Sequence, residues 1–192
     1  KGEMFNPGPW VAHSIQVAKA ARGIAAAHPE LDPESAYVFG LLHDIGRAEG
    51  VAGMRHIIDG YNFMTAEGYP DAARICLTHS YPIQNVMSGS CPWDGSTEER
   101  KFLAEFLAEI TYTPYDRLVQ LCDVICLPSG PVLMEKRMVD ITLRYGLNDF
   151  TTQNWQVFFD IKQDFEKTIG GSIYDLLPGV VKNTFGSIKG GD

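Results

Sequence analysis

The sequence predicts an all-α protein, and three observations support this class. Apolar residues recur at spacings of three and four along most of the chain, as on the buried face of an amphipathic helix. Helix-start signals precede several of these segments, for example Asp32-Pro33-Glu34 and the capping box Ser96-Thr97-Glu98-Glu99. The sequence contains no convincing strand pattern, internal repeat or low-complexity tract. We therefore expect a protein made almost entirely of helices.

The helices expected before residue 128 are separated by turn residues, mostly proline, glycine and serine. They cover residues 10–27, 33–44, 55–68, 72–79, 96–110 and 115–127. Residues 81–95 form an irregular loop between two of them, long enough to suggest that it covers a site.

The last of these helices is apolar almost all round from Leu118 to Cys126, which is typical of a buried helix. Asp123 lies in its middle. Because burying an unpaired carboxylate costs several kcal/mol, we expect an arginine, a set of hydrogen bonds or a metal ion beside it.

The run Pro128-Ser129-Gly130-Pro131 is the best candidate for an internal boundary. It would divide the chain into a core of residues 1–128 and a helical extension of residues 129–192 that packs on the core. Helices are expected over residues 132–145, about 154–169 and 173–177. This part contains no histidine and no other obvious chemistry, so it is interpreted as structural packing, as a lid or as a dimer surface.

Composition excludes several classes of function. A net charge of −8 and a pI near 5.1 argue against a nucleic-acid polymer as partner. A small phosphorylated ligand remains open, because a metal ion can supply positive charge locally. The four cysteines form no CxxC pair, no apolar run reaches about 18 residues, and no secretory signal is visible. We expect reduced thiols, no membrane span and a cytoplasmic location.

The stretch Gly40-Leu41-Leu42-His43-Asp44-Ile45-Gly46-Arg47 carries the clearest chemical signal. Imidazole nitrogen and carboxylate oxygen are common ligands of zinc, iron and manganese. Adjacent residues on a helix point about 100° apart, so His43 and Asp44 converge best where a helix ends, and Gly46 is expected to end it. A carboxylate at that end opposes the helix dipole unless a cation lies against it.

Four of the five histidines fall on four successive predicted helices: His13, His43, His56 and His79. Each alone is more often a packed, hydrogen-bonded histidine than a ligand. Together with Asp123 they suggest one shared site. His28, which precedes a proline at a helix end, is assigned no chemistry.

The order H…HD…H…H…D over residues 8–128 resembles the HD superfamily of metal-dependent phosphohydrolases, and His43-Asp44-Ile45-Gly46 spells the HDIG form of its motif. The two extra histidines are similar to the two-metal branch, which includes small bacterial proteins that cleave diadenosine tetraphosphate. The resemblance implies an HD-domain helical bundle, here with additional C-terminal helices.

The resemblance also implies a ligand set for one or two divalent ions, with iron, manganese, nickel and zinc all possible. His13, His43, Asp44 and Asp123 would hold the first ion, and His56 and His79 the second, with Asp44 bridging. Some branches place another histidine after the last one, whereas this chain has Ser80. The second ion would thus keep an open position for water or substrate.

The implied activity is hydrolysis of a small phosphorylated substrate, a nucleotide or another phosphoester, by a metal-activated hydroxide. Asp44 and Arg47 would be catalytic, and Arg47 would anchor phosphate, although a surface arginine at a helix end is an equal alternative. Arg55 and Arg117 are weaker candidates for substrate binding. Asp59 could orient His56, but a solvated surface acid is the more ordinary interpretation.

Two alternatives use the same residues. HD-fold di-iron oxygenases cleave C–C or C–P bonds with similar ligands, and a non-enzymatic HD module could sense a nucleotide. A basic residue directly after the motif favours the hydrolase. A homodimer is compatible with the unassigned C-terminal helices.

Overall fold

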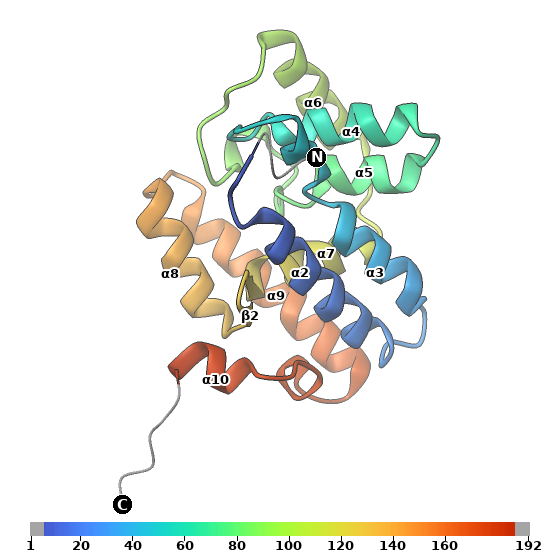
Figure 1. The fold of residues 1–192 in the computed structure, drawn as a ribbon, viewed down its shortest axis with the longest axis vertical. Helices are drawn as coiled ribbons and strands as arrows, with labels where there is room; N and C mark the ends of the chain where they lie inside the picture. The colour runs from blue at the N-terminus through green and yellow to red at the C-terminus, as the bar shows by residue number, and fades with distance from the viewer. Residues whose placement is uncertain (1–5, 187–192) are drawn as a thin grey trace, which may run out of the picture.

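The computed structural model of the chain describes residues 6–186 and confirms the all-α class (Figure 1). The α-helices are α2 (Trp10–Ala25), α3 (Pro33–Leu42), α4 (His56–Ala66), α5 (Pro70–Thr78), α6 (Thr97–Glu109), α7 (Pro114–Ile125), α8 (Met134–Tyr145), α9 (Thr151–Ile169) and α10 (Val180–Phe185). The shorter elements are the 3-10 helices η1 (Ile45–Glu49), η2 (Val86–Ser88) and η3 (Ile173–Leu176) and the strands β1 (Cys126–Leu127) and β2 (Gly130–Pro131). Within the described residues, no helix is both long and apolar enough to cross a membrane.

The predicted helix starts are confirmed by their hydrogen bonds. The Asp32 carboxylate accepts from the Ser35 amide at the start of α3, with Pro33 in the first turn. Ser96 and Glu99 form a complete capping box at the start of α6. These bonds satisfy amides that have no partner inside the helix.

The two largest of three hydrophobic groups organise the helices. The larger one joins α2 and α7 to α8, α9 and η3, and includes Ile24, Leu121, Met134 and Phe165. The second lies between α4, α5 and α6, which form the upper part of the molecule in Figure 1. The larger core contains residues from both sides of position 128, so the C-terminal helices share it. The division into residues 1–128 and 129–192 stays a prediction.

The segment predicted to be a boundary is a tight turn. Cys126 pairs with Pro131 and Leu127 with Gly130 in an antiparallel two-stranded hairpin, and the Val132 amide donates to the Ile125 carbonyl over 2.8 Å. The sequence did not reveal these strands because two residues cannot show an alternating pattern. The hairpin ends α7 and turns the chain back into α8.

A glycine sets the distance between α2 and α3. A Cβ added to Gly40 would lie 2.8 Å from the Ala18 Cα atom, so only glycine allows this approach. Figure 1 shows the two helices lying side by side near the centre of the molecule. Their close packing brings His13, early on α2, toward His43, directly after α3.

Candidate metal centre

The structure gathers six side chains that are far apart in the sequence. They are His13 on α2, His43 and Asp44 directly after α3, His56 at the start of α4, His79 directly after α5 and Asp123 on α7. Five of these six residues are buried, and Asp123 is partly buried. All six therefore belong to one place in the fold, where the ends of several helices meet.

His43 and Asp44 converge because α3 ends between Leu42 and Asp44. His43 still has helical dihedral angles, whereas Asp44 has φ −102° and ψ 14°. The change in backbone direction lets both side chains face the same site. Gly46 does not end the helix, contrary to our expectation: the helix has already ended at Leu42, and Gly46 lies inside the 3-10 helix η1 without a positive φ.

Gly46 instead permits close packing between η1 and α4. A Cβ on Gly46 would lie 2.0 Å from the His56 carbonyl oxygen and 2.4 Å from the Gly60 amide nitrogen. Such a contact is possible only without a side chain. The approach places Asp44 and Arg47 against His56.

Three histidines present the same nitrogen to the site. The Nδ1 atoms of His43, His56 and His79 face backbone carbonyls: Gly40 at 2.7 Å, Gly53 at 2.5 Å and Cys76 at 3.0 Å. A carbonyl oxygen can only accept, so each Nδ1 carries the proton. In the neutral rings, each Nε2 is left with a lone pair that faces the cluster, which is the form in which imidazole binds a metal.

These lone pairs meet the Asp44 carboxylate. Its Oδ1 atom lies 3.0 Å from His56 Nε2 and 3.6 Å from His79 Nε2, and the two nitrogens are 3.4 Å apart. Both Asp44 Oδ1 and His43 Nε2 are buried without a hydrogen-bond partner. Acceptors that face one another away from water are unfavourable unless a cation lies among them. The donor set therefore fits a divalent metal ion.

Protons are a poor alternative to a metal at this site. Burial lowers the pKa of His43 to about 4, and burial together with the Arg47 charge lowers the pKa of His56. Burial alone would raise the pKa of Asp44, but the Arg47 guanidinium holds it well below its usual value. The carboxylate is thus ionised and the two imidazoles are neutral.

A second group of ligand atoms adjoins the first. His13, His43 and Asp123 each offer an atom within 4.8 Å of the others, as do His43, Asp44 and His79. His13 Nε2 lies 2.9 Å from Asp123 Oδ1. Burial would raise the pKa of Asp123, but the hydrogen bond to His13 lowers it. The Asp123 carboxylate, expected to need a partner, has one.

Arg47 connects the cluster to an adjoining cavity. Its Nε atom donates to Asp44 Oδ2 over 2.7 Å, and the side chain is 25% exposed. Burial opposes its charge, but Asp44 raises the pKa of Arg47 above the ordinary value. Arg47, Asp44, His13, His56, His79 and Asp123 all line one cavity of about 430 Å³. Its volume is within the range of small-molecule sites.

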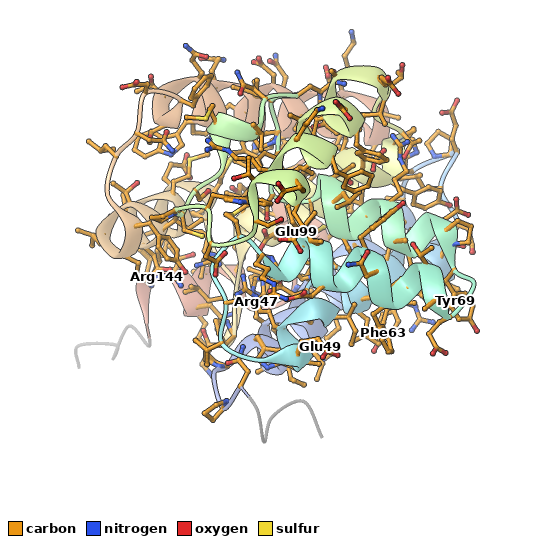
Figure 2. All side chains as sticks on the ribbon, turned by 90° about the horizontal axis from the view of Figure 1, so that it is seen from above. Arg47, Glu49, Phe63, Tyr69, Glu99 and Arg144 are labelled. Atoms are coloured by element: carbon orange, nitrogen blue, oxygen red, sulfur yellow. The ribbon has the colours of Figure 1, made fainter. Side chains whose placement is uncertain are left out.

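The cavity wall also contains residues that the sequence did not suggest. Arg137, Asp140 and Arg144 come from α8, which belongs to the part of the chain expected to be structural packing, a lid or a dimer surface. Figure 2 labels Arg47 and Arg144, which come from two of the segments that line the cavity. The spacing of three and four residues between Arg137, Asp140 and Arg144 puts them on one face of α8, and this is the only signal in the sequence that could have identified them.

Arg55 and Arg117, suggested as substrate contacts, do not line this cavity. Arg55 is half exposed and pairs with Asp59 over 3.4 Å. The Gly53 carbonyl, and not Asp59, binds His56 Nδ1. Arg117 donates to the Pro82 carbonyl and stacks on the Tyr112 ring. The structure brings neither arginine to the histidine cluster.

The loop 81–95 contributes to the site in two ways. Ser90 and Cys91 line the cavity. Asp94 accepts from the amides of Gly53 and Arg55 over 2.5 Å and 2.7 Å. Because the Gly53 carbonyl orients His56, Asp94 fixes the backbone that positions this histidine, a role that the sequence did not reveal.

Comparison with known families gives one match. A family model described as "HD domain" matches residues 10–126. These limits include every member of the histidine and aspartate cluster. No curated protein and no solved structure matches the chain.

Proposed function

The chain belongs to the HD domain family, and on that premise we propose that it is a metal-dependent phosphohydrolase acting on a small phosphorylated substrate. One observation carries the proposal: the Asp44 carboxylate faces the Nε2 atoms of His56 and His79 in a buried site beside a cavity. This arrangement needs a cation, and a substrate can reach it.

The ligands divide into two overlapping sets. His13, His43, Asp44 and Asp123 would hold one ion, and His56 and His79 a second, with Asp44 shared. When bound, divalent ions of this kind supply Lewis acidity at phosphoryl oxygens and a source of hydroxide near neutral pH. The ligand chemistry suits iron, manganese, nickel and zinc alike.

The chain's own residues would prepare this site. The carbonyls of Gly40, Gly53 and Cys76 fix the three imidazole rings in the tautomer that faces inward. Arg47 lies at the cavity wall with Nε bound to Asp44. Its terminal nitrogens make only long contacts of 3.4 Å, so they are the groups that would donate to a phosphoryl oxygen.

The proposal is tested by loading purified protein with manganese, iron, nickel or zinc and measuring turnover of p-nitrophenyl phosphate, its diester and a panel of nucleotides. We expect turnover that depends on metal and is lost in Asp44→Ala while the helical circular dichroism is retained. Asp149→Ala, which changes an exposed carboxylate, is the matched control.

Other outcomes would support the alternative functions. A visible spectrum of mixed-valent iron with oxygen consumption would indicate an oxygenase. Nucleotide binding without turnover by any metal-loaded form would indicate a sensor. Either result would overturn the hydrolase proposal.

The location and assembly state are part of the same proposal. All four cysteines are free and three are buried, which supports a reducing, cytoplasmic location. A homodimer stays a prediction, to be checked by light scattering on the purified chain.

A further inference from the structure

Helix α8 contributes three charged side chains to the wall of the cavity. Arg137, Asp140 and Arg144 are three and four residues apart and therefore share one face of the helix. Asp140 Oδ2 accepts from Arg137 and from Arg144, each over 2.7 Å. Two guanidinium groups thus share one carboxylate, which leaves a net positive charge at this wall.

Arg137 is more deeply placed than a surface ion pair requires. Its side chain is only 11% exposed, whereas those of Asp140 and Arg144 are 40% and 46% exposed. Its Nε atom is buried and has no hydrogen-bond partner. A buried guanidinium donor without an acceptor is costly, so the ion pair with Asp140 leaves part of the hydrogen-bonding capacity of Arg137 unused.

The same cavity contains the histidine cluster and Arg47. The substrate of the proposed reaction would place one phosphoryl group at the cluster. A cavity of about 430 Å³ has room for more than this group. The part of the substrate that extends from the cluster would meet the wall formed by α8.

We propose that Arg137 and Arg144 bind a second oxyanion of the substrate, so that the substrate is a phosphoester with a further phosphate or carboxylate. This inference rests on the proposed function. A planar guanidinium binds both kinds of oxyanion through paired hydrogen bonds. Asp140 holds the two arginines in place and keeps their net charge low before the substrate binds.

The test uses three probes that the enzyme does not hydrolyse: propylphosphonate, propane bisphosphonate and phosphonopropionate. Each carries one phosphonate, and the last two add a phosphonate or a carboxylate at the other end. Binding to the metal-loaded full chain is measured by calorimetry. We expect at least one of the doubly anionic probes to bind about tenfold more tightly than propylphosphonate, the gain of one charged hydrogen bond. The two compounds distinguish phosphate from carboxylate.

Three variants identify the residues. Arg137→Gln and Arg144→Gln should each reduce this preference, and the more exposed Arg144 provides a variant that folds even if Arg137→Gln does not. Asp140→Asn should increase the preference, because it removes the competing negative charge, whereas a purely structural ion pair predicts no increase. Arg22→Gln, whose arginine pairs with Glu34 on the surface outside this cavity, is the matched control.

The two proposals fail separately. Equal binding of all three probes, or a preference that is unchanged in both arginine variants, would overturn the inference that Arg137 and Arg144 bind a second oxyanion. This holds even if p-nitrophenyl phosphate is hydrolysed. Absence of turnover with every phosphoester would overturn the hydrolase. A preference that depends on Arg137 would then still support an anion site in this cavity.

Discussion

His13 on α2 and Asp123 on α7 are separated by 110 residues, yet His13 Nε2 lies 2.9 Å from Asp123 Oδ1. The contact joins the first and the last histidine-cluster helices of the chain. It gives a partner to the carboxylate in the apolar C-terminal part of α7. Asp123 is an ionised group held beside imidazole nitrogens, which is the arrangement expected of a metal ligand.

Replacing this carboxylate should change metal content selectively. Asp123→Asn keeps the side-chain shape but removes the negative charge, so we expect loss of an ion from the set that contains His13 and His43. His56→Ala should remove the other ion and leave the first. Elemental analysis after dialysis measures both. Wild-type metal content in Asp123→Asn would contradict the assignment.

Gly46→Ala should strongly destabilise the fold. The new Cβ atom would lie 2.0 Å from a backbone oxygen of α4, so η1 and α4 must separate. We expect a loss of about 3 kcal/mol in the free energy of unfolding, at the upper end for overpacking, measured by urea denaturation. Gly171→Ala is the control, because no atom lies within 4 Å of its added Cβ. Equal stability of the two variants would show that the contact can relax.

Arg74→Met should reveal the cost of an unpaired buried carboxylate. Asp116 is fully buried and receives two Arg74 nitrogens, in addition to hydroxyl donors from Thr78 and Thr113. Removing the arginine leaves the charge in place, which typically costs about 3 kcal/mol.

The matched control for Arg74 is Arg22→Met, which breaks an exposed pair with Glu34. It should cost less than about 1 kcal/mol. Urea denaturation of both variants gives the comparison. Similar small losses would mean that the threonine hydroxyls suffice for Asp116.

The metal-free protein should lose stability as the pH falls below neutrality. The pKa of His43 is about 4 in the folded chain against 6.5 as the ordinary value. Between these values the unfolded chain takes up a proton that the folded chain does not, so the contribution is complete above pH 6.5 and decreases toward pH 4. Below pH 3.8 the folded protein loses further stability, because the pKa of Asp123 is lower in the folded chain than its ordinary value of 3.8.

Urea denaturation with a chelator at several pH values measures this effect. We expect the unfolding free energy to decrease by up to about 3 kcal/mol over the His43 range. His43→Gln should flatten the decrease. A slope identical to that of the wild type would show that another group titrates there.

Local patterns in the sequence predicted most of the secondary structure. Capping residues and apolar spacing predicted, to within one residue, the helix starts at Pro33, Thr97 and Pro114, because these depend on neighbours within one turn. The short hairpin at residues 126–131 and α10 were not predicted. Both are too brief to show a period, and the hairpin depends on pairing rather than on propensity.

The sequence by itself determined that this is a helical protein of the HD family. It also determined which histidines and aspartates were candidates for one site, because the motif and the spacing of these residues are properties of the sequence. Only the tertiary structure decided how they meet: Gly40 and Gly46 let helices approach, and backbone carbonyls turn three imidazoles inward. It also brought Arg137 and Arg144 to the cavity and left Arg55 and Arg117 outside it. The physical reason is that contacts between distant segments depend on packing distances between helices, which no local sequence pattern specifies.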